Sequence, residues 1–372
     1  MLKVGITGQN GFIGSYLFNS LGLFKDEFER IIFDKSFFEE SEKLEEFVKK
    51  CDVIVHLAAL NRHEDNNVLH DTNILLVEKL IYALKQTESK AHVIFSSSTQ
   101  EEKDNLYGKS KTNCRELLIN WSLSYGGKFT GLMIPNVFGP FGKPNYNSVV
   151  ATFCYKLINN QNPIIEVDTK LKLIYVGDLT NIILDKIRRS EINHQEWINN
   201  IYEITVSDLL KKLFYFKESY LVNGIVPKLE DLFDINLFNT FRSYIDIENI
   251  FPRRYIKHSD YRGCFVEVIK LGVGGQISFS TTDEGVTRGN HFHTRKIERF
   301  SVIKGDALIQ LRKINDTKIY NFHLNGNEPS YVDMPIWFTH NIKNVGTEVL
   351  YTIFWINEFY DENDPDTYFE NV

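Results

Sequence analysis

The sequence predicts two different folds in one chain, a doubly wound parallel α/β domain followed by an all-β sandwich or barrel. In the first half, short apolar runs alternate with amphipathic stretches, which is the rhythm of βαβ units. From Arg262 onward, short strand-like runs are separated by Gly, Asn and Asp, a pattern typical of sandwiches and barrels. The length of 372 residues also suits two domains better than one.

The boundary between the domains is predicted from a change in texture. Periodicity lapses near residue 245, and Pro252 is followed there by two arginines. We therefore expect a first domain over residues 1–245, a linker over 246–259 and a second domain over 260–372.

In the first domain the alternation predicts four strand–helix pairs and a fifth strand. The pairs are Leu2–Thr7 with Phe12–Leu23, Arg30–Asp34 with Ser41–Lys50, Val53–Leu57 with Asn73–Lys85, and Ala91–Ser97 with Tyr107–Ser124, and the fifth strand is Thr130–Pro135. The loop after the fifth strand is rich in Gly, Pro and Asn, and it follows the carboxyl end of the strand, where doubly wound folds bind ligands. Residues 148–245 are expected to be largely helical and to complete this domain.

The second domain is predicted from short strands separated by turn residues. They are Phe265–Lys270, Gln276–Thr281, Arg299–Lys304, Ala307–Arg312, Lys318–Leu324, Ser330–Asp333 and Val349–Trp355.

Composition excludes several classes of protein. The net charge of -7 argues against broad binding to nucleic acid or to an anionic membrane. No run of about 18 apolar residues indicates a membrane span, and the start of the chain lacks the features of a secretory signal. The four cysteines are scattered singly, without a C-x-x-C pair. We expect a cytoplasmic protein without disulfides.

A glycine-rich turn after the first strand predicts a dinucleotide site. Gly8 and Gly11 let the backbone approach a pyrophosphate, Phe12 and Ile13 open the helix, and Gly14 lets that helix pack closely on the strand. A tight turn without a ligand would show the same spacing, but the flanking strand and helix favour the cofactor.

Two further segments belong to this predicted cofactor site. Asp34, at the end of the second predicted strand, would bond an adenosine ribose and favour NAD, whereas Lys35 beside it could admit NADP. The choice of cofactor stays open. Leu57, Ala58 and Ala59 close the third strand beside the expected cofactor, although a plain strand end would look the same.

The segment from Tyr107 to Lys111 predicts acid–base chemistry. These two residues are four apart and fall on one face of a helix, and a nearby ammonium favours the phenolate and lowers the tyrosine pKa. Ser98, at the end of the preceding strand, could bond the same substrate oxygen. The pair of Tyr107 and Lys111 alone would also fit a helix surface. Its place in the chain after the glycine-rich turn and Ser98 is a more specific sign of catalysis.

The last third of the chain predicts a metal site. His291, His293, Glu298 and His340 supply three imidazoles and a carboxylate, a donor set that suits Zn, Fe, Mn or Ni. We expect His291 and His293 to point to the same side of a strand, with the other two arriving from neighbouring strands. The alternative is a His-rich surface turn.

These motifs carry two resemblances. The first 240 or so residues resemble the extended short-chain dehydrogenase/reductases that act on nucleotide sugars, which implies a Rossmann domain. The resemblance implies that Ser98 and Tyr107 polarise and protonate a keto oxygen, that Lys111 also holds the nicotinamide ribose, and that Asn73 supports the active-site helix. Sugar 4,6-dehydratases of this superfamily have Asp-Glu after the catalytic Ser/Thr. Here Thr99 and Gln100 follow Ser98, so elimination of water is not expected.

The second resemblance covers residues from about 260 to 372. The spacing of Gly285, the four candidate ligands and Gly305 resembles the two cupin motifs, which implies a cupin barrel with a metal bound. Trp337 stands where the second motif usually has glycine. Metal-free deoxysugar epimerases of related fold lack a comparable ligand set.

Over its full length the chain resembles bifunctional capsular-polysaccharide enzymes that form UDP-2-acetamido-2,6-dideoxy-L-talose. In that family the cupin epimerises a 4-keto sugar at C3 and the reductase then reduces C4 with NADPH. The resemblance implies a UDP-linked deoxy-keto sugar as substrate, NADP(H) with NAD(H) as the alternative, Zn²⁺ or another divalent metal, a homodimer, and a role in capsule or O-antigen precursor synthesis. His323, Tyr331 and Lys296 are candidate proton carriers by residue type alone.

Two other functions stay open. In the first, only the reductase is catalytic and the cupin is a zinc-stabilised dimerisation or binding module. In the second, favoured by Asp34, the protein is a nucleotide-sugar 4-epimerase that retains its NAD.

Overall fold

The computed structural model describes residues 1–199 and 201–372 of the chain. By its internal contacts the chain divides into two compact units. The first consists of Met1–Thr152 and Ile165–Ser207, and the second of Phe153–Ile164 and Asp208–Val372. The helices of residues 208–245, which the sequence pattern assigns to the first domain, therefore group with the second unit. The domain boundaries at 245 and 260 stay predictions, because a division by internal contacts does not locate the boundaries of evolutionary domains.

The first unit is built on a six-stranded parallel sheet with the order β2-β1-β3-β4-β5-β8. The predicted parallel sheet is confirmed. Its strands are β1 Leu2–Thr7, β2 Phe28–Ile31, β3 Val53–His56, β4 His92–Ser98, β5 Lys128–Ile134 and β8 Asn193–Trp197. The chain passes from β1 to β2 on one side and then returns to β3 on the other side. The order therefore reverses between β1 and β3, and open α/β sheets bind ligands at such a point.

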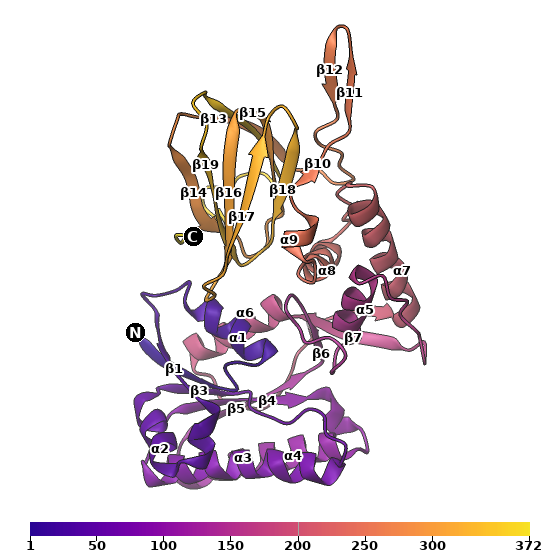
Figure 1. The fold of residues 1–372 in the computed structure, drawn as a ribbon. Helices are drawn as coiled ribbons and strands as arrows, with labels where there is room; N and C mark the ends of the chain where they lie inside the picture. The colour runs from indigo at the N-terminus through magenta and orange to yellow at the C-terminus, as the bar shows by residue number, and fades with distance from the viewer. Residues whose placement is uncertain (200) are drawn as a thin grey trace. The chain divides into compact units, whose positions relative to one another are not determined.

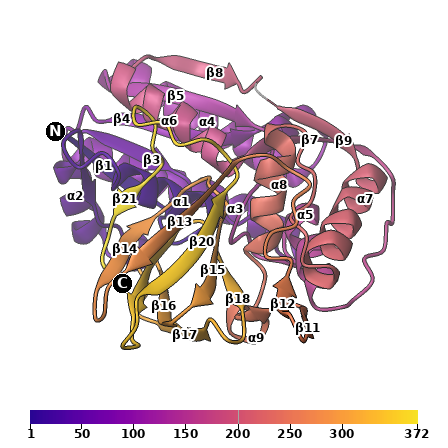
Figure 2. The ribbon, with the colours of Figure 1, turned by 90° about the horizontal axis from the view of Figure 1, so that it is seen from above.

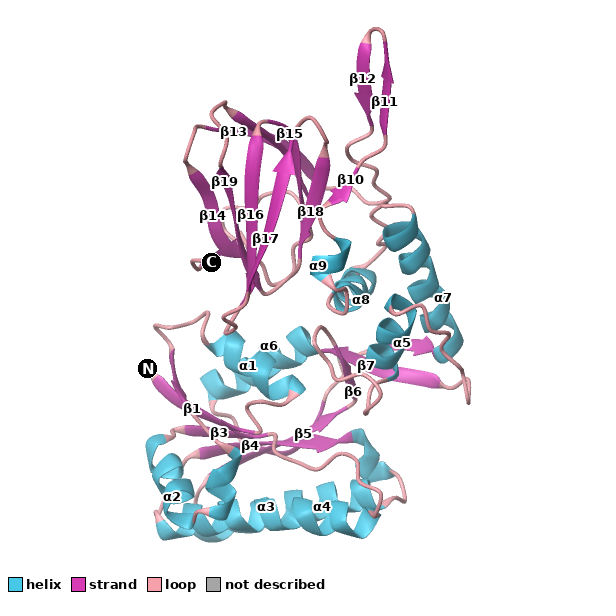
Figure 3. Ribbon diagram, viewed as in Figure 1, coloured by secondary structure: helices cyan, strands magenta, loops and turns pink. Residues whose placement is uncertain are grey.

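Helices cover both faces of this sheet (Figure 1; Figure 3). The helices α2, α3 and α4 lie on one face, and α1 and α6 lie on the other. Their bounds, with two 3₁₀ segments, are α1 Phe12–Leu21, η1 Lys35–Glu39, α2 Ser41–Lys50, α3 Asn66–Gln86, η2 Thr99–Glu102, α4 Leu106–Tyr125 and α6 Val176–Arg189. The helix α3 begins at Asn66, earlier than the predicted Asn73. Both faces being covered explains why the strands are continuous apolar runs.

Successive residues of the central strands are buried on opposite faces. Val53 and Val55 of β3 belong to the core cluster with α1 and α6, whereas Ile54 between them belongs to the cluster with α2, α3 and α4. In the same way Ile94 of β4 faces one cluster, and Val93 and Phe95 face the other. This alternation follows from the two-residue period of a strand. The parallel pairing of β1 with β3 and of β3 with β4 places their carboxyl ends side by side.

The second unit contains two antiparallel five-stranded sheets, with the orders β10-β18-β15-β20-β13 and β17-β16-β19-β14-β21 (Figure 2). Their strands are β10 Arg253–Arg254, β13 Gln276–Thr282, β14 Thr287–Phe292, β15 Glu298–Lys304, β16 Asp306–Lys313, β17 Ile319–Asn325, β18 Ser330–Met334, β19 Phe338–Asn344, β20 Leu350–Ile356 and β21 Tyr368–Phe369. The ring of Phe300 on β15 contacts that of His340 on β19, with centroids 5.8 Å apart, so the sheets face each other. The predicted all-β region is confirmed.

The remaining elements of the described residues are helices and short strands. A small sheet of the first unit contains β6 Asn136–Phe138, β7 Lys170–Tyr175 and β9 Tyr202–Thr205. Two helices each span a division between the units, α5 Val149–Ile158 and α7 Val206–Phe216. The second unit also contains η3 Lys217–Val222, α8 Leu232–Arg242, α9 Ile247–Ile250 and the hairpin of β11 Lys257–Asp260 with β12 Gly263–Val266. Residues 246–259, expected as a linker, contain α9, β10 and most of β11, and β10 pairs with β18.

Several expected elements differ from the structure. The strands β14 and β19 are missing from the predicted set, and of the strand expected at Phe265–Lys270 only Phe265 and Val266 lie in β12. Strand β2 ends at Ile31, so Asp34 lies in the turn after it rather than at its end. Among the residues that the structure describes, no helix is long and apolar enough to cross a membrane.

Candidate functional site

The glycine-rich turn directly follows β1 and leads into α1. Gly8 has a φ of 76°, and a Cβ there would lie 2.8 Å from the backbone nitrogen of Ala58 at the exit of β3. A Cβ on Gly14 would lie 2.2 Å from the carbonyl oxygen of Gly8. A side chain at Gly8 would therefore push the turn away from the exit of β3, and one at Gly14 would push the helix away from the turn. The nitrogen of Gly11 donates to that same Gly8 oxygen at 2.9 Å and closes the turn.

The helix that follows this turn is suited to an anion. Gly11 is the N-cap of α1, and the helix begins at Phe12. The amides of Phe12 and Ile13 belong to the first turn, where a helix has no intrahelical acceptor for its N–H groups and carries partial positive charge. The close glycine turn and this helix start together fit the pyrophosphate of a dinucleotide.

The other predicted cofactor residues lie at neighbouring strand exits. Leu57 donates from its backbone nitrogen to the Thr7 oxygen at 3.1 Å, which continues the β1–β3 ladder and brings Ala58 and Ala59 beside the turn. Asp34 is exposed, and its carboxylate accepts from the Ser36 nitrogen at 2.8 Å. The hydrogen bonds from Ser36 lower the pKa of Asp34. An ionised, exposed carboxylate therefore follows β2.

Tyr107 and Lys111 share one face of α4, but their polar atoms have different partners. The ammonium of Lys111 donates to the Ser96 carbonyl at 2.8 Å, and it lies 5.8 Å from the centre of the Tyr107 ring. Burial lowers the pKa of Lys111 to about 8, and burial with the neighbouring Tyr146 raises the pKa of Tyr107 to about 12. The expected lowering of the tyrosine pKa by Lys111 was wrong, because burial and the neighbouring Tyr146 raise that pKa.

Ser98 and Asn73 lie where they can support this helix and its neighbourhood. Ser98 ends β4, and its hydroxyl accepts from the Gln100 nitrogen at 3.2 Å at the start of η2. Asn73 of α3 donates to the Ser110 hydroxyl at 3.2 Å, and Ser110 donates to the Tyr107 carbonyl at 2.7 Å. Asn73 is thus linked to the turn of α4 that carries Tyr107.

Two residues near Tyr107 are absent from the motifs. The hydroxyl of Tyr107 donates to the Asn61 side-chain oxygen at 3.2 Å. Asn61 belongs to a loop that is tied to the loop after β6, since Arg62 donates to the Tyr146 carbonyl at 3.1 Å and Asn147 donates to the Asn61 carbonyl at 3.4 Å. Tyr146 belongs to the Gly-, Pro- and Asn-rich loop that the sequence marked as a place for ligands, but no motif pairs it or Asn61 with Tyr107.

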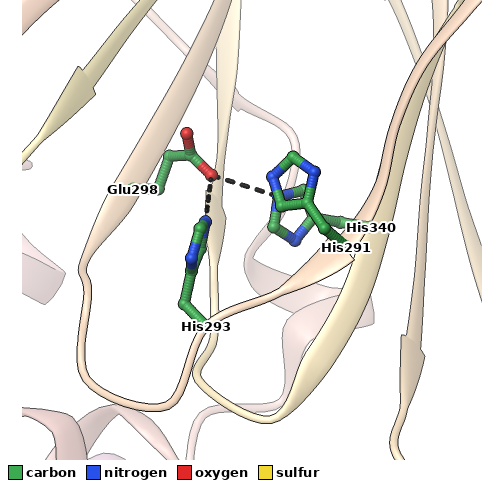
Figure 4. Close-up of side chains that lie close together, drawn as sticks. All are labelled: His291, His293, Glu298 and His340. Carbon is green, nitrogen blue, oxygen red and sulfur yellow. Dashed lines mark hydrogen bonds and ion pairs between the residues drawn. The ribbon is translucent and has the colours of Figure 1, made fainter. Parts of the chain in front are cut away.

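The four predicted metal ligands come together in the second unit. One potential ligand atom from each of His291, His293, Glu298 and His340 lies within 4.8 Å of the others. His291 and His340 belong to β14 and β19 of one sheet, Glu298 to β15 of the other, and His293 to the turn between them. Glu298 faces both His293 and His340 (Figure 4). The alternative of a surface turn is excluded by the burial of three of these residues.

Hydrogen bonds orient two of these imidazoles with Nε2 toward the carboxylate. The Nδ1 of His293 bonds the Asp366 carbonyl at 2.6 Å, and that of His340 bonds the Phe338 carbonyl at 3.2 Å. A carbonyl only accepts, so each Nδ1 carries the proton. Each Nε2 then faces the Oε2 of Glu298, at 3.2 Å and 3.1 Å respectively. The buried Nε2 of His340 has no well-aligned hydrogen bond. Lone pairs of nitrogen and oxygen that converge in this way fit a cation.

The electrostatics of the cluster support the same assignment. Burial, followed by the neighbouring His340 and His293, lowers the pKa of His291 to about 4, so this imidazole is neutral at pH 7. Burial alone would raise the pKa of Glu298, but the neighbouring His293 and His340 hold it well below its usual value. Metal ligands must be deprotonated, and the cluster provides a carboxylate and at least one neutral imidazole.

Trp337 occupies a backbone conformation that favours glycine. Its φ is 62°, which agrees with a motif position that usually holds glycine. Its nitrogen donates to the His293 carbonyl at 2.8 Å, and its ring stacks on Phe292 with centroids 5.6 Å apart. Trp337 therefore packs beside two residues at the end of β14.

Two of the three candidate proton carriers have other partners, and the third is exposed. Lys296 is buried and donates to the Pro365 carbonyl at 2.7 Å. The ring of Tyr331 lies 3.8 Å from the guanidinium carbon of Arg299, and His323 is exposed on β17. Their observed contacts give no support to a role in proton transfer.

Comparison with known proteins identifies the class of protein. Residues 4–201 match the NAD dependent epimerase/dehydratase family, and residues 258–368 match the polysaccharide biosynthesis C-terminal domain. The chain belongs to the NAD dependent epimerase/dehydratase family, and it is an enzyme of that family with a second, all-β part.

Two relatives match the chain over its full length. A UDP-2-acetamido-2,6-beta-L-arabino-hexul-4-ose reductase from Pseudomonas aeruginosa is 33% identical over 371 residues, which cover 99% of this chain and 98% of the relative. The crystal structure of the capsular polysaccharide assembling protein CapF from Staphylococcus aureus is 34% identical, with 100% of both chains covered and a TM-score of 0.64.

Two other matches cover one part of the chain each. The spore coat polysaccharide biosynthesis protein SpsL from Bacillus subtilis is 26% identical over 130 residues, 32% of this chain and 86% of the relative. A UDP-N-acetylglucosamine 4-epimerase from Methanobrevibacter ruminantium is 21% identical, with a TM-score of 0.54 over 65% of this chain and 98% of that one. This last likeness supports the fold alone.

Proposed function

We propose that the chain reduces the C4 ketone of a UDP-2-acetamido-2,6-dideoxy-4-ketohexose and also epimerises that sugar at C3 in a metal-bound cupin barrel. The observation that carries this proposal is the four-residue His/Glu cluster in a chain whose full length matches a UDP-4-ketosugar reductase. The product would be a precursor for capsule or O-antigen synthesis. We also propose a cytoplasmic homodimer.

In the reduction we assign proton transfer to the residues at the β4–α4 turn. Bound NAD(P)H would supply the hydride. Tyr107 is positioned to give a proton to the C4 oxygen as charge develops on it, and Ser98 to bond the same oxygen. Lys111 suits a second role, to hold the nicotinamide ribose, because its ammonium donates to the carbonyl of Ser96, two residues before the end of β4. NADPH is the proposed cofactor, with NADH as the alternative that the exposed Asp34 favours.

In the epimerisation we assign His291, His293, Glu298 and His340 to a divalent metal, with Zn²⁺ as the first choice. When bound, this metal would supply Lewis acidity next to the C4 oxygen. A 4-ketone acidifies the neighbouring C3 proton, because removal of that proton places negative charge on the ketone oxygen. A positive site at this oxygen therefore lowers the free-energy cost of removing the C3 proton. The donor set of three imidazoles and one carboxylate supports the assignment.

The test is to incubate the protein with NADPH and a UDP-N-acetyl-4-keto-6-deoxyhexosamine in D₂O and to read the product by proton NMR. The two-step reaction predicts deuterium at C3 of a 4-reduced sugar, above a control without enzyme. Reduction without deuterium would contradict the epimerase and leave the barrel as a structural or dimerisation module. A tightly retained NAD after gel filtration, with no net reduction, would instead favour a nucleotide-sugar 4-epimerase.

A further inference from the structure

We infer that Asp366 is a positioning residue for the metal site, and that it fixes the tautomer and the ring direction of His293. The inference rests on the proposed metal site and adds a residue that lies outside the ligand motifs. Asp366 is far along the chain from His293, yet its carbonyl oxygen accepts from His293 Nδ1 at 2.6 Å.

The three imidazoles are oriented in different ways. His291 has a backbone hydrogen bond with Gly289 on its own strand, and His340 bonds the carbonyl of Phe338, two residues before it on β19. These two contacts form whenever their strands form. The carbonyl that orients His293 comes from a segment 73 residues away. Its position therefore depends on whatever holds that segment in place.

The carboxylate of Asp366 supplies that anchor. Its Oδ1 accepts from the Thr294 nitrogen at 3.0 Å and from the Thr294 hydroxyl at 2.6 Å. Its Oδ2 accepts from the nitrogens of Arg295 and Lys296, each at 3.0 Å. Three successive amides directly after His293 thus converge on one buried carboxylate, which is 2% exposed. Charge-assisted bonds of this kind are stronger than bonds between neutral groups.

The backbone of Asp366 needs this support. Its φ is 38°, a left-handed conformation that costs free energy in a residue with a side chain. The four donors fix the side chain, and the strained backbone then turns the carbonyl toward His293. The neighbouring contact from Lys296 Nζ to the Pro365 carbonyl, at 2.7 Å, holds the same segment. One residue therefore fixes both the loop after His293 and the imidazole itself.

The consequence for the metal is a defined ligand atom. With Nδ1 protonated against the Asp366 carbonyl, only Nε2 of His293 has a lone pair, and it points toward Glu298 at 3.2 Å. Contacts that orient a metal-bound histidine from outside the ligand set change metal affinity by about 10–100-fold when removed. The carbonyl itself cannot be substituted, but the carboxylate that holds it can.

The experiment compares Asp366→Asn with Asp364→Asn. Both variants lose one negative charge from the same segment, but Asp364 is exposed and bonds only the Arg295 side chain among its described hydrogen bonds. An asparagine at 366 would offer one oxygen and one NH₂ group where two oxygens now accept. Zn²⁺ affinity is measured on the full chain by competition with a fluorescent chelator, and the visible spectrum of the Co²⁺-loaded protein reports the ligand geometry.

The expected result is a loss of Zn²⁺ affinity of about 10–100-fold for Asp366→Asn and none for Asp364→Asn. Hydrogen exchange in the metal-free protein should become faster at residues 294–296 in Asp366→Asn alone. If Asp366→Asn does not fold, Thr294→Val removes only the hydroxyl donor and should give a smaller loss in the same direction. Equal affinities in folded variants would overturn the inference. A wild-type chain that binds no metal would overturn both the inference and the proposed metal site.

Discussion

Arg299 and Asp333 form a two-point ion pair in the second unit, with Nε to Oδ1 at 2.7 Å and Nη2 to Oδ2 at 2.9 Å. Both side chains are almost fully buried, and Tyr220 donates to the same carboxylate at 2.6 Å. Burial alone would raise the pKa of Asp333, but the Arg299 guanidinium keeps it below its usual value. The pair joins β15 and β18 to the helical segment that contains Tyr220.

We expect Asp333→Asn to destabilise the protein by about 3–5 kcal/mol, because it leaves a buried guanidinium without its counter-charge. The matched control is Glu328→Gln, which removes a carboxylate from the exposed pair with Arg254 and should cost no more than about 1 kcal/mol. Urea unfolding of the second unit, followed by tryptophan fluorescence, measures both. Similar losses in the two variants would contradict the assignment of the buried pair.

Burial of the charged Lys111 lowers the stability of the protein, and we expect the same residue to be needed for reductase activity. Its pKa is lowered from 10.5 to about 8, which corresponds to about 3 kcal/mol of cost for burying the charge. Lys111→Met should remove this cost but leave the Ser96 carbonyl without its donor, at about 1–3 kcal/mol. We expect a variant that is more stable at pH 7 by as much as about 2 kcal/mol, with little reductase activity.

The pH dependence gives the sign of this effect. Below about pH 8 both the folded and the unfolded chain carry the Lys111 charge, and the cost is complete. Between 8 and 10.5 only the unfolded chain is charged, so wild-type stability rises with pH relative to Lys111→Met. Lys109→Met, on the exposed side of the same helix, is the control and should show no such trend. Chemical denaturation of the three proteins at several pH values measures their free energies of unfolding and tests this trend.

Tyr107→Phe should abolish the proton transfer of reduction while the dinucleotide still binds. We expect the turnover rate to fall by about a hundredfold to ten-thousandfold, as is usual when a general acid is removed. The control Tyr125→Phe changes an exposed tyrosine at the end of the same helix. NADPH oxidation at saturating substrate gives the rate, and NADPH fluorescence titration gives the affinity. A full rate in Tyr107→Phe would exclude it as the acid.

Glu298→Gln should separate the two proposed activities. A neutral amide in place of the carboxylate should weaken metal binding by more than about 100-fold, since we propose that the anion is a direct ligand. Deuterium incorporation at C3 should be lost, whereas reduction of a sugar already epimerised at C3 should continue. Glu348→Gln changes an exposed carboxylate of the same unit and should do neither. Loss of both activities in a folded Glu298→Gln would show that the second unit also serves the reduction.

The sequence predicted the four side chains of the His/Glu cluster better than the strands that carry them. Strands β14 and β19 contain Gly289, Asn290, Asn341 and Asn344, residues with low strand propensity, so periodicity did not mark them. The spacing of the His and Glu residues did mark this region. Few residue types can bind a metal, whereas many residue types can form a strand. The β1–α1 turn and the parallel sheet were predictable for a similar reason, since glycines and apolar runs are local signals.

Contacts between distant backbone atoms lie beyond such prediction. The carbonyl that Asp366 offers to His293 depends on a left-handed backbone and not on a residue type. Asn61 meets the Tyr107 hydroxyl only because two irregular loops are tied together. The direction of the Tyr107 pKa shift was also wrong, because it depends on burial, which a helix spacing does not contain.

The division of the chain into units has a consequence for dissecting the enzyme. Residues 153–164 belong to the second unit although residues 165–207, which follow them, belong to the first. The polypeptide therefore crosses between the units three times, and no single cleavage point yields both halves whole. A fragment that ends at residue 245 would carry the helices α7 and α8 without the sheets they group with. Separating the activities will need point substitutions rather than truncation.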